Sequence, residues 1–221
     1  MLSAGAVQPG LMKIIGAFRL EAGRSVQIDF ATAPAITKRI AAGAPIDVVI
    51  APTDLLDALK RSFQVSTQSV PLGRIGVGVM VRAGAPHPSI ANIGEFQQSL
   101  HIAERIVYNQ ASTGIYLDSL FQRLGMAATM AAKTLRYADF SAVRDHVSTG
   151  QGNEIGFGAT TVIIENADKG IAFVGPLPTE IQNYTAYAAA LTTNAGEGAA
   201  AFTDYLASPA ARSILRAVGI D

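Results

Sequence analysis

The sequence predicts an α/β protein of two lobes, each a mostly parallel sheet flanked by helices, with a ligand cleft between the lobes. Three observations predict this fold class. Short apolar runs alternate with segments of helical periodicity along the chain. The 221 residues include 21 glycines and 10 prolines, which favours many short turns. Four strand-to-helix junctions are rich in small and hydroxyl residues, and they are spread over the chain.

The four junctions are the first functional signal. They lie at residues 3–9, 31–34, 109–114 and 156–161. Unpaired backbone N–H groups and the positive dipole end of a helix at such a junction favour a negatively charged ligand, without a lysine or an arginine. Two junctions lie in the first quarter of the chain and two much later, so we expect them to face a cleft between two lobes.

The first part of the chain is predicted to follow a βαβαβα order. Pro9 is favoured in the first turn of a helix, and Gly43 is favoured just after the end of one. We expect a strand just after Met1, a helix carrying Leu11, Ile14, Ile15 and Phe18, a strand over 26–30, a helix from Pro34 to Gly43, a strand over 48–50, and a helix capped by Thr53. This order indicates a parallel sheet covered by helices.

Residues 74–82 alternate apolar side chains with glycines, which predicts a strand. Gly76 and Gly78 leave one face of this strand able to approach other backbone closely. We expect the chain to leave the first lobe near residue 78 and to return near residue 185. The predicted lobes are therefore 1–78 with 185–221, and 79–184.

The remaining elements repeat the α/β pattern. We expect helices over 93–100, from Ser112 or Thr113 to Gly125, over 141–147, over 197–206 and from Ser208-Pro209 to Gly219, with strands over 106–108, 154–157, 171–174 and 184–191. Gly175-Pro176 is expected to end the strand before it.

Composition excludes several classes of function. Lys plus Arg and Asp plus Glu both number 17, so no bulk charge attracts nucleic acid or an anionic membrane. There is no cysteine, and the three histidines lack ligand spacing, so we expect no metal site and no cofactor. No apolar run is long enough to span a bilayer. Walker A, dinucleotide-binding and Gly-x-Ser-x-Gly motifs are also absent.

Three parts of the chain match a known family. They are residues 2–7, the Gly-Ala-Pro-x-Asp-Val block within 40–50, and the tail formed by 202–206, Ser208-Pro209 and 217–220. With these segments the chain resembles the type II periplasmic solute-binding proteins, in their molybdate-binding-protein-like branch of ABC transporter substrate-binding proteins. The resemblance implies two α/β lobes joined by two crossover segments, with the ligand held by helix N-termini and hydroxyl groups.

The resemblance also implies an oxyanion site with a serine in each of the first two junctions and a tyrosine after the late strand. Ala6, Ala33 and Ala159 stand at these positions here. Each hydrogen bond to a charged group contributes about 1.5 to 3 kcal/mol, so three lost donors leave a wider and less polar pocket. We therefore expect a small organic di- or tricarboxylate in place of molybdate or tungstate. If these alanines are misaligned with the family, molybdate or tungstate is the expected ligand.

Several residues are candidates for contact with the ligand. They are Gly5, Ala6, Val7, Thr32, Ala33, Arg74, Ser112, Thr113, Gly114, Tyr116, Ser141, Arg144, Thr160 and Thr161. N-capping is the alternative explanation for Ser112, Thr113 and the threonine pair. Arg144 could form a bidentate carboxylate clamp, or it could pair with Asp145. Tyr108 is expected in the core.

Two classes of function remain open. In the first, the protein is a receptor that closes on an organic anion by a hinge motion and delivers it to the permease of an ABC-type importer. In the second, it is an isomerase, because one enzyme similar to this family, an aconitate isomerase, shifts a proton along a tricarboxylate. The candidate acids and bases are His146, Tyr116 and Glu154. A cytoplasmic sensor is a further alternative. If the protein is a receptor, we expect it to be a monomer without a catalytic residue.

The start of the chain bears on its location. It lacks a charged segment followed by an apolar one, which is the pattern of a signal peptide. We expect a periplasmic protein whose signal peptide has been removed, with a cytoplasmic protein as the alternative.

Overall fold

The computed structural model describes all residues 1–221 and divides them into two compact units. Unit 1 comprises Met1–Ile75 and Thr185–Asp221, and unit 2 comprises Gly76–Tyr184. The chain leaves unit 1 within strand β4 (Val70–Arg82) and returns at the start of β9 (Tyr184–Leu191). The crossings predicted from the sequence lie near residues 78 and 185.

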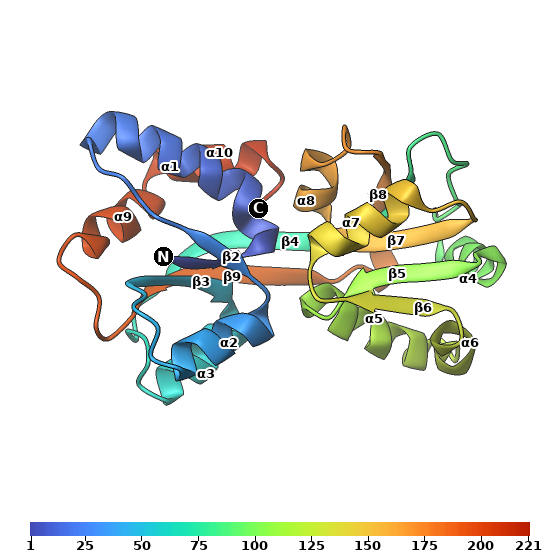
Figure 1. Cartoon of the computed structure of the whole chain (residues 1–221), viewed down its shortest axis with the longest axis horizontal. Coiled ribbons are helices and arrows are strands. Elements are labelled where there is room, and N and C mark those ends of the chain that lie inside the picture. Colours follow the sequence, from blue (N-terminus) through green and yellow to red (C-terminus); the bar gives the residue numbers. More distant parts are fainter. The chain divides into compact units, whose positions relative to one another are not determined.

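Unit 1 contains a sheet in the order β2-β1-β3-β9 with helices on both faces (Figure 1). Its elements are β1 (Leu2–Ala4), η1 (Gly5–Val7), α1 (Gln8–Ala22), β2 (Asp29–Ala31), α2 (Ala33–Ala41), β3 (Val48–Pro52), α3 (Thr53–Arg61), α9 (Ala199–Leu206) and α10 (Pro209–Ala217). Strand β1 runs parallel to β2 and β3, and β9 runs antiparallel to β3. Helices α1, α9 and α10 cover one face, and α2 and α3 cover the other.

Helices α1 and α10 of unit 1 pack closely because a glycine lies at their contact. A Cβ atom at Gly10 would come within 2.8 Å of Leu215, so a glycine on α1 lets this helix lie against α10. Helix α10 begins as expected at Ser208-Pro209, where the Ser208 hydroxyl accepts a hydrogen bond from the Ala211 amide at 3.1 Å.

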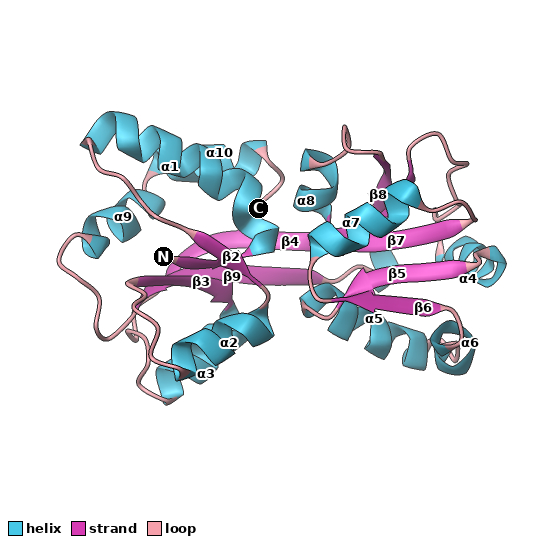
Figure 2. Ribbon diagram, in the orientation of Figure 1, coloured by secondary structure: helices cyan, strands magenta, loops and turns pink.

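Unit 2 contains a second sheet in which β5 (Arg105–Asn109) is the central parallel strand. Its other elements are α4 (Ile93–Ile102), α5 (Ser112–Arg123), α6 (Ala127–Ala131), β6 (Thr134–Tyr137), α7 (Phe140–Thr149), β7 (Glu154–Ala159), α8 (Thr160–Glu165), β8 (Ile171–Pro176) and η2 (Thr179–Ile181). Strand β5 is parallel to β6 and β7, whereas β4 is antiparallel to β7 and β8 (Figure 2). The predicted α/β fold is confirmed.

The two faces of the unit 2 sheet carry two separate cores. Ile106 and Tyr108 point to the core under α4, α5 and α6, while Val107 points to the core under α7 and α8. Gly156 and Gly158 lie on the α7 side of β7, where an added Cβ atom would come within 2.8 Å of Val147 and within 2.7 Å of the Phe140 ring. These glycines therefore let α7 pack directly on the sheet.

Some local expectations are wrong, each for a physical reason. The second strand is Asp29–Ala31, later than 26–30, because it pairs only with β1 at the edge of its sheet. Helix α6 and strand β6 were not expected, since both are short and neither has a clear hydrophobic period. Strand β8 continues through Pro176 because it pairs with β4.

Other expectations at single residues are also corrected. The atoms closest to an added Cβ at Gly76 and Gly78 belong to side chains, including those of Gln182 and Phe173, and not to backbone. Thr53 is the first residue of α3 and does not cap it, because the N-cap position is held by Pro52.

Within unit 2, Lys133 ties the end of α4 to the segment just before β6. Its Nζ atom donates to the carbonyl oxygens of Leu100 at 2.7 Å, His101 at 2.9 Å and Ala103 at 2.7 Å. The last carbonyls of a helix have no partner within the helix, so this ammonium group satisfies them.

We expect Lys133→Met to lower the free energy of unfolding by about 2 kcal/mol, since it removes hydrogen bonds to a charged donor. Urea denaturation measures this change. Lys169→Met is the matched control, because Lys169 Nζ makes an exposed bond to Asn166 at 3.0 Å and its loss should cost less than about 0.5 kcal/mol. Equal effects of the two substitutions would contradict the capping role of Lys133.

Candidate functional site

Two helices begin at one edge of the unit 2 sheet. Strands β5 and β7 are parallel, with Val107 opposite Gly156, so their carboxyl ends lie at the same edge. Helix α5 begins at Ser112, just beyond β5, and α8 begins at Thr160, directly after β7. Ligands of open α/β sheets bind outside the carboxyl ends of parallel strands, so this edge is a candidate site.

The hydroxyl residues at this edge do not cap their helices. The N-cap positions of α5 and α8 are Ala111 and Ala159, which have no side-chain oxygen to offer. Capping therefore does not explain Ser112, Thr113, Thr160 or Thr161, contrary to the alternative drawn from the sequence. Thr161 is buried, with 2% of its surface exposed. Neither helix has an acidic residue in its first turn, so each keeps amide donors and an unneutralised positive dipole end.

Gly114 and Asn109 shape the junction between β5 and α5. The Asn109 side chain accepts a hydrogen bond from the Ala111 amide at 3.1 Å, which turns the chain at the end of the strand. A Cβ atom at Gly114 would overlap the carbonyl oxygen of Asn109 and lie 2.9 Å from the Tyr108 ring. Glycine is thus required for the first turn of α5 to lie against the end of β5. The role of Asn109 in this turn was not predicted from the sequence, although an asparagine at the end of a strand is a typical turn signal.

Unit 1 has an equivalent edge. Strands β1 and β2 are parallel, and Ala4 pairs with Ala31 at their carboxyl ends. The Gly5–Val7 turn leads from β1 into α1, and Thr32 and Ala33 lead from β2 into α2. Gly5, Ala6, Thr32 and Ala33 are partly exposed, whereas Val7 is buried in the core. Thr32 holds the N-cap position of α2, but its side chain does not cap the helix.

Ser141 and Arg144 lie on α7. This helix begins at Phe140 and is capped by Asp139, which accepts a hydrogen bond from the Ala142 amide at 3.0 Å. It does not open at Ser141, which is an exposed residue of its first turn. The Arg144 guanidinium donates to Asp145 at 2.6 and 2.9 Å and to Asn166 at 3.0 Å. A carboxylate clamp by Arg144 stays a prediction, and it would require these bonds to break.

Arg74 and Tyr116 lie on different units. Arg74 is an exposed residue of β4, and its backbone bonds to Asp221 near the end of the chain. Tyr116 lies in α5, where its hydroxyl donates to the Ile181 carbonyl at 2.6 Å and accepts from Arg123 at 3.1 Å. Their contacts with a ligand stay predictions.

His146 and Glu154 are brought together, but at the opposite end of β7 from Thr160. His146 Nε2 lies 3.1 Å from Glu154 Oε2, and His146 Nδ1 lies 2.8 Å from the Tyr137 hydroxyl. Glu154 begins β7 and Ala159 ends it, so about 16 Å of strand separates this pair from the junction edge. The three candidate acids and bases do not form one cluster, since Tyr116 contacts neither of the other two.

Tyr108 is a core residue, as expected, with a polar end. Its side chain is 2% exposed, and its hydroxyl donates to Asp118 at 2.8 Å. Asp118 also pairs with Arg136 at 3.0 Å. Burial, and then the hydrogen bond to Asp118, raise the pKa of Tyr108 well above its ordinary value of 10.0.

This shift has a consequence for stability at high pH. Because the folded state holds the neutral phenol, the stability from Tyr108 is complete below pH 10.0 and is lost as the pH rises above it. We expect Tyr108→Phe to cost about 1 to 2 kcal/mol at neutral pH and to weaken this alkaline loss. Denaturant unfolding at neutral and alkaline pH tests both effects.

Tyr205→Phe is the matched control for Tyr108. The Tyr205 hydroxyl also donates to a carboxylate, that of Glu21 at 2.8 Å, but the bond is exposed. Its removal should change stability by less than about 0.5 kcal/mol. An unchanged alkaline loss in Tyr108→Phe would show that this phenol does not couple folding to pH.

No helix of this protein has both the length and the apolar character needed to cross a bilayer. The sequence of all residues 1–221 matches the family model of bacterial extracellular solute-binding proteins. An aconitate isomerase from Pseudomonas sp. is 32% identical over 231 residues, which cover 100% of this chain and 86% of the relative. The molybdate-binding protein ModA of Escherichia coli K12 is 25% identical over 226 residues, or 99% of this chain and 87% of the relative.

A solved structure supports the same fold. The periplasmic molybdate-binding protein of Azotobacter vinelandii superposes with a TM-score of 0.80 at 19% identity, covering 100% of this chain and 97% of the other. The predicted type II fold of the molybdate-binding-like branch is thereby confirmed.

Proposed function

Because this chain belongs to the family of bacterial extracellular solute-binding proteins, we propose that it binds a small organic anion at its strand-to-helix junctions. The proposed ligand is a di- or tricarboxylate. The proposed role is that of the substrate-binding component of an ABC-type importer, located outside the cytoplasmic membrane, which passes the ligand to a permease. A hinge motion at the two chain crossings, within β4 and at the start of β9, belongs to the same proposal.

The observation that carries the proposal is the edge where α5 and α8 begin. Two helix N-termini at the carboxyl ends of neighbouring parallel strands supply amide donors and positive dipole ends, without an acidic residue to neutralise them. Ser112, Thr113 and Thr160 add hydroxyl donors that no helix uses as its N-cap. Such a set of neutral donors suits an anion of several oxygen atoms.

Two facts favour an organic anion over molybdate. Ala6 and Ala33 offer no side-chain donor in the unit 1 junctions, and Ala159 offers none in unit 2. The relative named an aconitate isomerase is 32% identical, against 25% for the molybdate-binding relative. Aconitate is a tricarboxylate, which agrees with a site that has fewer side-chain donors.

A thermal-shift panel tests the proposal. The purified protein is heated with molybdate, tungstate, sulfate, phosphate, citrate, malate, cis-aconitate or trans-aconitate. A ligand at about 100 times its dissociation constant adds about 2.7 kcal/mol of stability, which raises Tm by several degrees. We expect a shift with a carboxylate and none with molybdate. A shift with molybdate alone would exclude the organic-anion proposal.

The alanines can be tested directly. We expect the double variant Ala6→Ser with Ala33→Ser to bind molybdate at least about tenfold more tightly than the natural sequence, since each added donor to a charged ligand contributes about 1.5 to 3 kcal/mol. Isothermal titration calorimetry measures this gain. Ala42→Ser, an exposed change at the end of α2, is the control. No gain in the double variant would mean that these positions do not meet the ligand.

An isomerase is the second candidate function, and the aconitate isomerase relative favours it. Its geometric support is weaker, because His146 and Glu154 lie at the far end of β7 from the junctions. Incubation with cis- or trans-aconitate, followed by NMR, separates the two functions. A receptor binds one isomer and leaves it unchanged, whereas an isomerase brings both isomers to equilibrium.

A further inference from the structure

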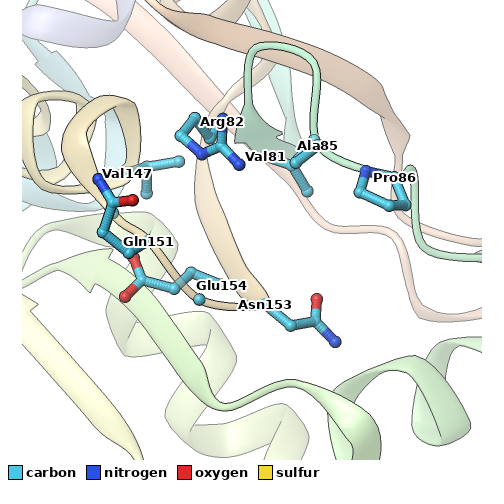
Figure 3. A pocket seen from close by; sticks show the side chains of 10 residues that line it. Val81, Arg82, Ala85, Pro86, Val147, Gln151, Asn153 and Glu154 are labelled. Carbon is cyan, nitrogen blue, oxygen red and sulfur yellow. The ribbon is translucent and has the colours of Figure 1, made fainter.

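A cavity of about 400 Å³ lies within unit 2, away from the junction edge. It is formed by the end of β4, the following turn, the last turn of α7 and the start of β7. Figure 3 shows Arg82 on one side of it and Glu154 with Gln151 on the other. This volume falls in the range of small-molecule sites, about 300 to 1,000 Å³.

The charged groups that line this cavity are buried without full partners. The Glu154 side chain is 10% exposed, and no hydrogen-bond donor satisfies its Oε2 atom. Oε1 lies 3.8 Å from Arg105 Nε, which is longer than a hydrogen bond. On the other side, Arg82 Nε is buried and also lacks a partner. Arg82 and Glu154 do not pair with each other.

His146 lies beside the Glu154 carboxylate but does not form a hydrogen bond with it. Its Nε2 atom lies 3.1 Å from Oε2, at ion-pair distance, but neither atom has a hydrogen bond. The carboxylate packs against Gly150, where an added Cβ atom would overlap Oε2. A buried polar atom without a partner costs about 1 to 3 kcal/mol, so a ligand that supplied the missing bonds would be stabilised here.

The two charges restrict the chemistry of that ligand. A simple anion would pair with Arg82 and leave Glu154 with only its 3.8 Å ion pair to Arg105 and its 3.1 Å contact with His146, neither of which is a hydrogen bond. A simple cation would leave Arg82 Nε without a partner. An apolar molecule would leave both groups without partners. A molecule with an acidic and a basic end meets both, with its carboxylate toward the guanidinium and its ammonium toward the Glu154 carboxylate.

We propose that this cavity of unit 2 is a second ligand site, for a small zwitterion of the free amino-acid type held between Arg82 and Glu154. The site is separate from the junction edge, so its occupant differs from the organic anion proposed above. Val147 supplies an apolar wall that suits the side chain of such a ligand.

Amide NMR of the whole protein tests the proposal. Each protein amino acid is added singly at millimolar concentration, with succinate and putrescine as probes that carry only one kind of charge. We expect at least one amino acid to shift the amides of residues 81–86 and 147–154 saturably, while succinate and putrescine leave them in place. If no amino acid shifts these amides, the proposal is wrong.

Two substitutions locate the binding. Glu154→Gln keeps the shape and removes the charge, so it should weaken binding of the amino acid at least tenfold. Ala85→Phe fills the cavity from its surface turn and should abolish binding without touching the core, which keeps the test valid if Glu154→Gln does not fold. Ala83→Phe is the matched control, since Ala83 is in the same turn but does not line the cavity. Binding that survives both Glu154→Gln and Ala85→Phe would overturn the proposal.

The same variants separate this site from the proposed junction site. Ala85→Phe should keep the thermal shift produced by the carboxylate. If it lost the response to the carboxylate together with that to the amino acid, one site would account for both, and the second site would be excluded. If the carboxylate panel gave no shift with any variant, the junction proposal would fail while this one stood.

Discussion

Replacing Gly114 with alanine should lower the free energy of unfolding by about 3 kcal/mol. The added Cβ atom would overlap the carbonyl oxygen of Asn109, a backbone atom that cannot rotate away, and would crowd the Tyr108 ring at 2.9 Å. The first turn of α5 must therefore move off the end of β5. Thermal and urea unfolding measure the loss of stability.

Gly114→Ala should also weaken anion binding, since the displaced turn carries Ser112 and Thr113. Gly16→Ala is the matched control. Gly16 is an exposed residue of α1, and nothing lies within 4 Å of its added Cβ atom. In an open helical position alanine is favoured over glycine by up to about 1 kcal/mol, so this variant should be slightly more stable. If neither Gly114→Ala nor Gly16→Ala changed the free energy of unfolding, α5 would not be packed tightly against the end of β5.

Removing the hydroxyl groups at the junction edge should weaken carboxylate binding strongly. We expect Ser112→Ala, Thr113→Val and Thr160→Val each to reduce affinity about tenfold or more, since a hydrogen bond to a charged ligand contributes about 1.5 to 3 kcal/mol and about 1.4 kcal/mol is tenfold. Calorimetry with the carboxylate that stabilises the protein most in the thermal panel measures the effect.

Thr149→Val is the matched control for these hydroxyl variants. The Thr149 hydroxyl donates to the Asp145 carbonyl at 2.8 Å on the last turn of α7, which lies beside Glu154 at the opposite end of β7 from the junction edge. Affinity should not change in this variant. Unchanged affinity in all three junction variants as well would show that the anion binds elsewhere, and it would leave the family assignment intact.

Much of the architecture could be predicted from local signals. The order of strands and helices follows from apolar periodicity and from turn residues such as Pro9 and Ser208, because these act within a few neighbours along the chain. Expectations failed where the signal is short or comes from a distant segment. Strand β6 has only four residues and is held by its pairing with β5, and the N-caps Ala111 and Ala159 give no capping signal.

The grouping of side chains could not be read from the chain. His146 and Glu154 meet because α7 packs on the β7 face that carries Gly156 and Gly158. Arg82 borders the same cavity because the end of β4 lies near the start of β7, its antiparallel neighbour. Both contacts depend on strand pairing and close packing between segments far apart in sequence.

The sequence by itself determined the fold class, the family resemblance and the positions of the four junctions, since each of these is written in local composition and spacing. The tertiary structure decided which junctions share a sheet edge, which hydroxyls are not N-caps, and where the buried charges Arg82 and Glu154 lie. The physical reason is that strand register and helix packing join residues many positions apart. No local pattern specifies those pairings, and they set the chemistry of both sites.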